Sequence, residues 1–455
     1  MKKNIIYSMM VILASFYFTS ISAQEVTPPK EEVKTDESFP LKDGDVWVML
    51  GDSITAQHLH TNYIEAFCFA RYPKLNFCFR NSGVGGDTVV SAMSRFDWDV
   101  AAWKPTVVSV ELGMNDRNGF TVEKYIENMT KLNEKIKAIS ARPIYFTSSP
   151  INNGDTSESL GGNTRLNEFA TKLKDFASEQ KAPFADQFHD LLDVWGKNKP
   201  REASLAIKAT IEGNINLKNL AGAEHLKAYL AEIAKDTQPI ISMQGDPVHP
   251  GATGQLMMAA SILKHLKADG FVSSATVDAT GKMVESKGCV IENGKMEKDV
   301  LTFTRLDDCV PFPIPAEART VLPLCPAVLE LSQYTLKVTG LTGEKYTLKV
   351  NTVLTATLSG AELEAGINLS DFPQGAIANQ SKAILMAVAG KENIVSQWRG
   401  ASRTGNAANA KEEDKSKVEN LKKLVEEADA KIRAAAKPIL LTFEIAPFKA
   451  ATPAK

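Results

Sequence analysis

Four short stretches of the sequence carry side chains that could together transfer an acyl group. In the first, Gly-Asp-Ser-Ile-Thr, Ser53 follows an apolar run and precedes a helix-like segment, so a strand-to-helix turn would present its hydroxyl. In the last, Asp-Pro-Val-His-Pro-Gly, His249 stands three residues after Asp246. A histidine can take the proton of a serine hydroxyl when a carboxylate holds its other ring nitrogen. Ser53, His249 and Asp246 are therefore candidates for the three members of a catalytic triad.

The two middle stretches offer donors for the negative charge that develops on a carbonyl oxygen. Asn-Ser-Gly-Val-Gly-Gly-Asp-Thr contains Gly86, whose lack of a side chain lets the backbone approach a ligand closely. The adjacent Gly85 could take the same role, so the donor is one of these two glycines. Leu-Gly-Met-Asn-Asp supplies the side-chain amide of Asn115. With the N–H of Ser53, these groups could surround an oxyanion.

Each stretch alone also has a plain structural explanation. Gly-Asp-Ser is ordinary turn chemistry, the glycines could form a simple loop, Asn115 could cap a helix, and His249 could be a surface residue before a Pro-Gly turn. The presence of all four stretches favours the catalytic interpretation.

The elements around these stretches alternate between β-like runs and helical patterns. Strands are predicted at 46–50, 75–81, 107–112, 144–148 and 183–186, and helices at 63–71, 122–139, 164–180 and 254–267. Such alternation predicts an α/β fold with a doubly wound parallel sheet and helices on both faces. Loops at the carboxyl ends of parallel strands share one crevice, so the four stretches are expected to meet there.

In their order and spacing, the four stretches resemble the SGNH hydrolases, a subgroup of the GDSL esterases and lipases. The resemblance covers about residues 45–268 and implies a flavodoxin-like fold. It assigns the nucleophile to Ser53, the triad partners to Asp246 and His249, and the oxyanion hole to Ser53, Gly86 and Asn115. No cofactor and no metal are expected. Exported members with an added domain are similar to carbohydrate O-acetylesterases.

The N-terminus has the pattern of a secretory signal. Lys2 and Lys3 precede an apolar segment at 5–18, and small residues at 21–23 form a cleavage site. We therefore expect a signal peptide at 1–23 and a secreted or periplasmic protein. The polar stretch that follows predicts a leader or linker at 24–44. Further along the sequence no segment is long and apolar enough to span a bilayer, so no stable membrane insertion is expected.

The length of 455 residues favours two domains. The hydrolase domain is predicted at 45–269, with a helical insertion at about 195–240 that is either a surface addition or a lid or substrate-binding element. The remainder, 270–455, alternates like β-strands and is predicted as a β-rich C-terminal domain, with a hairpin turn at 340–344. A charged helix at about 411–433 is expected to pack one face on that domain.

The connection between the two predicted domains is too short for free tumbling, so a close interface is expected. Trp398 and Arg399 stand side by side in a helical stretch, a pair suited to stacking on a sugar or to anchoring an interface, although a packed tryptophan is the simpler explanation.

Composition limits the possible partners. The net charge of −2 with 44% hydrophobic residues is typical of a globular protein and gives no reason to expect nucleic acid. The five cysteines match no zinc pattern, and His58 and His60 would face different ways on a helix, so no metal site is predicted. The expected partner is a small-molecule or polysaccharide ester, and the oligomeric state stays open.

The favoured hypothesis is an exported serine esterase that removes O-acetyl groups from carbohydrate. A lipase, lysophospholipase or arylesterase is the alternative within the same chemistry. A glycan-binding protein with a vestigial esterase domain is the alternative of another class, and hydrolysis of p-nitrophenyl acetate would separate the two.

Overall fold

The computed structural model describes residues 39–217, 220–235, 240–407 and 409–449. The predicted signal peptide and most of the predicted leader lie outside this range. These described residues belong to one compact unit.

A five-stranded parallel sheet forms the core of the N-terminal half, with strand order β2-β1-β3-β4-β5. Its strands are β1 (Asp45–Gly51), β2 (Phe77–Gly83), β3 (Val107–Glu111), β4 (Arg142–Phe146) and β5 (Phe184–Ala185). They are almost entirely buried, as expected when helices cover both faces of a parallel sheet. The predicted α/β fold with a doubly wound sheet is confirmed.

Helices cover the two faces because successive side chains of a strand point to opposite sides. Val48 and Leu50 of β1 pack in a cluster with α3 (Val89–Asp99) and α4 (Val122–Ala138). Trp47 and Met49 pack in a second cluster with α2 (His60–Arg71), α6 (Gln187–Asn214) and α8 (Ala252–His265). The remaining helices of this half are α1 (Ser53–Ala56), α5 (Thr164–Glu179) and α7 (Ala223–Lys235).

Helix α3 was not among the predicted helices. Its start carries a capping box, in which Thr88 and Ser91 exchange side-chain and backbone hydrogen bonds. This pair of residues is the signal in the sequence that would have located the helix.

Two further sheets follow α8, packed around a third apolar cluster. The first, in the order β13-β10-β6-β7, consists of β6 (Phe271–Asp278), β7 (Met283–Lys287), β10 (Gln333–Thr339) and β13 (Ile367–Asn368). The second, in the order β12-β11-β14-β9-β8, consists of β8 (Cys289–Glu297), β9 (Val300–Asp307), β11 (Lys345–Val350), β12 (Val353–Ser359) and β14 (Leu441–Pro447). Short helices α9 (Ala327–Glu330) and α10 (Gly360–Ala365) lie between these strands.

The predicted hairpin turn at 340–344 is wrong. The strands on either side of it, β10 and β11, belong to different sheets, so the chain crosses from one sheet to the other there. The hairpin lies one strand later, where Asn351 and Thr352 join β11 to its antiparallel partner β12, both with positive φ. Alternating apolar residues mark both strands of a crossing as well as of a hairpin, so the pattern does not distinguish them.

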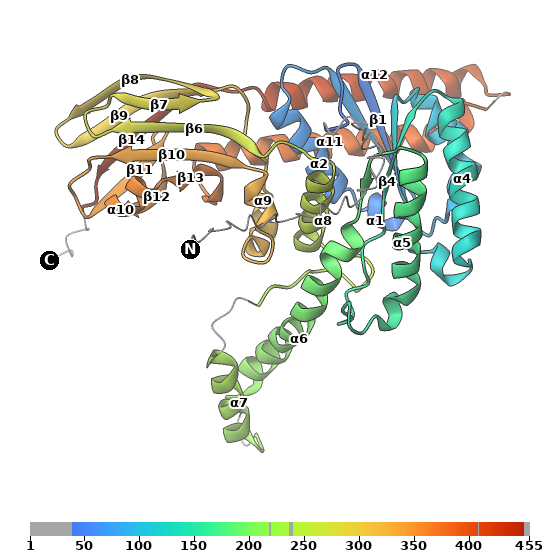
Figure 1. The fold of residues 1–455 in the computed structure, drawn as a ribbon, viewed down its shortest axis with the longest axis horizontal. Helices are drawn as coiled ribbons and strands as arrows, with labels where there is room; N and C mark the ends of the chain where they lie inside the picture. The colour runs from blue at the N-terminus through green and yellow to red at the C-terminus, as the bar shows by residue number, and fades with distance from the viewer. Residues whose placement is uncertain (1–38, 218–219, 236–239, 408, 450–455) are drawn as a thin grey trace, which may run out of the picture. The chain divides into compact units, whose positions relative to one another are not determined.

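Two long helices, α11 (Ala376–Gly405) and α12 (Glu412–Ala435), lie side by side against the parallel sheet (Figure 1). Trp398 and Val425 join the apolar cluster of one face, and Val388 and Ile432 join that of the other. The pair therefore covers the free edge of β2. The charged helix packs along α11, which lies in the same predicted C-terminal segment, and its buried stripe also reaches the cores of the parallel sheet. The predicted domain boundaries stay predictions.

The predicted insertion at about 195–240 corresponds to the outer part of α6 and to α7. Phe188, Leu191 and Trp195 in the first turns of α6 are buried, whereas no residue of α7 is. Figure 1 shows these helices extending away from the sheet. Among the described residues no helix is long and apolar enough to cross a membrane. All five cysteines are free.

Candidate active site

Ser53 stands where β1 gives way to α1, as predicted. The strand ends at Gly51 and the helix begins at Ser53, with the Asp52 carboxylate accepting the N–H of Ile54 at 2.9 Å. Gly83, at the end of β2, fits against this turn so closely that a Cβ there would lie 2.4 Å from the backbone nitrogen of Ala56. The ends of the first two strands can therefore meet only because residue 83 is glycine.

His249 reaches Ser53 from the loop before α8. Its Nε2 lies 2.7 Å from the Ser53 Oγ, and its Nδ1 lies 2.9 Å from one Asp246 oxygen. With Nδ1 protonated toward the carboxylate, Nε2 offers its lone pair to the hydroxyl. The structure thus places all three predicted triad residues in one hydrogen-bonded chain.

Asp246 is held in position by the backbone of its own turn. One of its oxygens accepts the N–H groups of Val248 and His249, each at 2.8 Å. The hydrogen bond from the His249 backbone, followed by that from the His249 ring, lowers the pKa of Asp246. The side chain is 60% exposed, so this end of the triad faces solvent.

The predicted oxyanion donors stand on the loop after β2 and just after β3. Gly85 is close enough that a Cβ on it would lie 3.9 Å from the Ser53 Cβ, and Gly86 has a positive φ of 79°. The Asn115 Nδ2 donates to the carbonyl of Asp87 at 2.9 Å. An amide carries two N–H groups, so this bond leaves the second for another acceptor. The choice between Gly85 and Gly86 stays open.

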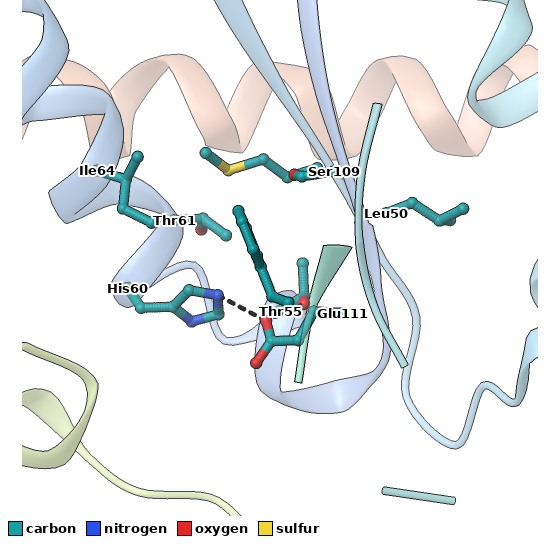
Figure 2. A pocket seen from close by; sticks show the side chains of 9 residues that line it. Leu50, Thr55, His60, Thr61, Ile64, Ser109 and Glu111 are labelled. Carbon is teal, nitrogen blue, oxygen red and sulfur yellow. Dashed lines mark hydrogen bonds and ion pairs between the residues drawn. The ribbon is translucent and has the colours of Figure 1, made fainter. Parts of the chain in front are cut away.

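A buried ion pair lies directly beneath α1. Figure 2 shows the His60 ring pointing at Glu111, and its Nε2 lies 2.8 Å from that carboxylate. The Oγ1 of Thr55, within α1, lies 3.1 Å from the same carboxylate. Burial alone would lower the pKa of His60, but the neighbouring Glu111 carboxylate raises it. The residues surround a cavity of about 10 Å³, about enough for one water.

The ion pair is connected to the loop that carries the triad histidine. The Gln255 Oε1 lies 2.9 Å from the backbone nitrogen of His60, which donates to it, and 2.8 Å from its ring Nδ1. The Gln255 Nε2 donates to the carbonyl of Pro250, the residue after His249, at 3.1 Å. These contacts tie the serine turn to the histidine loop through buried side chains. The sequence reading missed His60, Glu111 and Gln255, although a glutamate ending an apolar strand is a signal for a buried partner.

Asp52 is the most perturbed acid beside the nucleophile. Burial and, next, the negative charge of Glu111 raise its pKa to about 7, while the N–H of Ile54 opposes the shift. The carboxyl next to Ser53 is therefore largely protonated below neutral pH.

The first half of α6 supports the histidine loop from outside. Glu202 of α6 accepts the hydroxyl of Ser242 at 2.8 Å. From the loop after β4, the Asn152 nitrogen donates to the carbonyl of Pro247 at 2.8 Å. The Asn198 side chain donates to the carbonyl of Ile241. The insertion thus begins as part of the site's framework.

Three of the other histidines each lie against one carboxylate. His58 lies 3.4 Å from Glu392, His189 lies 2.8 Å from Asp186, and His265 lies 2.9 Å from Asp190. In the part of the chain that the structure describes, no three His, Cys, Asp or Glu side chains are arranged to hold a metal. Trp398 is 1% exposed and packs on Trp103, with ring centroids 3.8 Å apart, so it anchors an interface and does not stack on a sugar.

Comparison with known proteins bears on the family and the fold. Residues 49–256 match the model of the GDSL-like Lipase/Acylhydrolase family. The search of curated proteins finds no match. Among solved structures, a gut microbial diltiazem-metabolizing enzyme covers 90% of this chain and all of its own, with 20% identity and a TM-score of 0.71, and therefore shares the fold. Axe2, an acetylxylan esterase from Geobacillus stearothermophilus, covers 50% of this chain and 95% of its own, with 20% identity and a TM-score of 0.36.

Proposed function

Because residues 49–256 form a domain of the GDSL-like lipase/acylhydrolase family and the protein is a carboxylic ester hydrolase, we propose that it is an exported serine esterase that removes O-acetyl groups from carbohydrate. The observation that carries the proposal is the chain of contacts from Ser53 to His249 at 2.7 Å and from His249 to Asp246 at 2.9 Å.

The first half of the reaction forms an acyl-enzyme. His249 Nε2 takes the proton of Ser53 as the Oγ attacks the ester carbon, and Asp246 stabilises the imidazolium that results. The N–H group of Ser53, that of Gly86 or Gly85, and the free N–H of Asn115 receive the oxyanion. When the tetrahedral intermediate collapses, His249 gives its proton to the departing alcohol oxygen of the sugar.

The second half regenerates the enzyme. A water molecule loses a proton to His249 as it attacks the acetyl-serine carbonyl, and the same donors receive the second oxyanion. Collapse returns the proton to the Ser53 oxygen and releases acetate.

The carbohydrate substrate is supported by the resemblance to exported acetylesterases and by the openness of the site. Gly85, Gly86 and Asp246 are exposed, so an acetyl group on a bulky glycan can approach Ser53 without entering a tunnel. Export is supported by the signal pattern at 1–23. Mass spectrometry of the secreted protein should find Gln24 at its N-terminus, and retention of Met1 would argue against export.

Acetate release tests the substrate class. The mature enzyme would be assayed on p-nitrophenyl acetate, acetylated xylan, acetylated pectin, chitin oligomers and O-acetylated sialic acid, beside long-chain p-nitrophenyl esters and a lysophospholipid. We expect turnover of the acetyl esters. Preference for the long-chain esters or the lysophospholipid would instead assign a lipase or lysophospholipase, and turnover of aryl esters alone an arylesterase.

Substitution tests the site residues. Ser53→Ala should abolish hydrolysis with the fold intact, because it removes the attacking oxygen. Asn115→Ala should lower kcat about 100-fold, the scale of losing one oxyanion donor. Asp246→Asn should be milder than His249→Ala. A fully active Ser53→Ala enzyme would end the proposal, and an inactive wild type would favour a glycan-binding protein.

A further inference from the structure

The edge strand of the parallel sheet is covered by cations from the C-terminal helices. Arg433 of α12 donates to the carbonyls of Leu75 and Phe77, at the start of β2. Lys391 of α11 donates to the carbonyl of Phe79 at 2.9 Å. These groups satisfy backbone acceptors that an edge strand would otherwise leave without a partner strand.

Arg399 of α11 makes the last of these contacts, at the end of β2 nearest the active site. Its Nη1 donates to the Gly83 carbonyl at 2.8 Å. Its Nε and Nη2 bind the two oxygens of Asp99 at 2.7 and 2.8 Å, a planar two-point contact that only arginine can make. The Arg399 side chain is 14% exposed. One guanidinium therefore joins α11, α3 and the loop that follows β2.

Asp99 also forms an ion pair with Arg95. Arg95 contacts both the turn at 51–53, which carries the nucleophile, and the loop at 83–87, which carries Gly85 and Gly86 and is called the oxyanion loop. Asp99 is fully buried, and although burial alone would raise its pKa, the hydrogen bond from Arg399 and the charges of Arg399 and Arg95 lower it. Arg95 donates to the carbonyl of Gly51 at 3.2 Å and binds Asp87 at 2.6 Å. Gly51 stands two residues before the nucleophile, and Asp87 follows Gly86.

The Asp87 carbonyl is the acceptor that fixes the Asn115 amide, at 2.9 Å. The two ends of the oxyanion loop are thus held separately, with Arg399 on Gly83 and Arg95 on Asp87. The loop between them carries Gly85 and Gly86. Both arginines therefore contact the ends of this loop, and only Arg95 lies within residues 49–256, the hydrolase segment.

We propose that Arg399 is a positioning residue of the oxyanion hole, which it holds in place from outside the hydrolase segment by binding the Gly83 carbonyl and Asp99. The inference rests on the proposed function, since it assigns Arg399 to the same oxyanion donors. It predicts an effect on turnover, because donors that shift by a fraction of an ångström still admit the substrate but stabilise its oxyanion less.

Arg433 provides the matched control. It is also an arginine from the C-terminal helices that donates to β2 carbonyls, but at the opposite end of the strand from the active site. If both arginines have a purely structural role, Arg399→Met and Arg433→Met should change kcat and Tm alike. If Arg399 positions the oxyanion hole, only Arg399→Met should lower kcat markedly.

The experiment measures kcat, KM and Tm of the full mature enzyme on p-nitrophenyl acetate. In Arg399→Met we expect kcat to fall about 10-fold, less than on deleting a donor outright, with KM and the acidic limb of the pH profile unchanged. Arg433→Met should lower Tm but keep kcat within about 2-fold, as expected for a site remote from the donors. Arg399→Lys, which keeps a cation but not the two-point contact, should be intermediate.

A double-mutant cycle with Asn115→Ala adds a measurement that does not depend on protein stability. If Arg399 acts through the oxyanion hole, its effect on kcat should largely disappear in the Asn115→Ala enzyme.

An Arg399→Met enzyme with wild-type kcat, equal kcat losses in both arginine variants, or full additivity with Asn115→Ala would each overturn the inference. If Arg399→Met does not fold, Arg399→Lys decides by the same criteria. These outcomes are read against an active wild type and an inactive Ser53→Ala enzyme, so failure of the proposed function is recognised separately.

Discussion

Two pairs of helices that lie outside the parallel sheet differ in how much of their surface is buried. The pair α11 and α12 buries Trp398 and Val425 in the cores of the parallel sheet. The pair formed by outer α6 and α7 extends away from it, and α7 buries none of its residues. Both α7 and α12 are amphipathic and charged, so an apolar stripe predicts a helix but does not identify the surface it covers. What separates the pairs is the set of buried charges that α11 and α12 share with β2 and α2.

Removing residues 268–455 should produce the largest effect. A chain ending at Lys267 loses both α11 and α12, which exposes the edge of β2 and the apolar surface of both clusters. We expect insoluble protein without esterase activity after expression. A soluble monomer with wild-type activity would break the comparison, because it would make α11 and α12 as dispensable as α7.

Lys391→Met should be the most damaging single change among the buried charges. Lys391 is fully buried and binds Glu65 at 2.8 Å and also Glu392. Removing it leaves two carboxyl groups in the core without their cation, which costs about 3–5 kcal/mol in such pairs. Urea unfolding would measure the loss. Lys227→Met in α7, whose partner Glu224 is exposed, is the control and should leave the unfolding midpoint unchanged.

Glu65 gives the interface of α11 a pH dependence. Burial raises its pKa from 4.5 to about 8, with Lys391 opposing the shift and Glu392 adding to it. An acid with a higher pKa in the folded state binds more protons there, so the free energy of unfolding falls as pH rises from about 4.5 to about 8.

Glu65→Gln, which imitates the protonated acid, should therefore weaken this fall, by at most about 1.4 kcal/mol per pH unit. Urea unfolding at intervals between pH 5 and 8 would measure it. Glu224→Gln in the exposed pair should leave the slope unchanged. Parallel curves for the wild type and Glu65→Gln would show that Glu65 titrates alike in the folded and unfolded protein.

Tyr229→Ser in α7 should have the smallest effect. The side chain is 39% exposed, so Tm and kcat on p-nitrophenyl acetate should stay at wild-type values. Acetate release from a polymeric substrate would be measured beside them. A loss confined to the polymer would show that the extended helices bind substrate, the alternative that the sequence leaves open for this insertion.

The sequence predicted what depends on local pattern. Alternating runs located all five strands of the parallel sheet, and the four short stretches located Ser53, Asn115, Asp246 and His249 before any contact between them was known. Each of these signals lies within a few residues, where turn chemistry and periodicity act directly.

The contacts that support the site join residues far apart, and no local pattern reports them. His60 and Gln255 are 195 positions apart, and Lys391 and Glu65 are 326 apart. In the sequence, Lys391-Glu392 looks like an ordinary solvated pair on a helix. The pair is buried because α11 covers the edge of the parallel sheet, and that packing is set by the assembled sheet and not by the local sequence.

The cations that cover β2 also govern when the chain can become active. The bonds from Lys391 to Phe79, from Arg399 to Gly83 and from Arg433 to Phe77 close loops of 312, 316 and 356 positions. Contacts of such high sequence separation form late in folding, because the chain loses the entropy of closing a long loop before the contact can stabilise it. Ser53, Asp246 and His249 emerge before α11 and α12 during synthesis, but the carbonyls of the edge strand β2 have no partner until these helices have followed. The hydrolase is therefore expected to gain activity only after nearly the whole chain has been made.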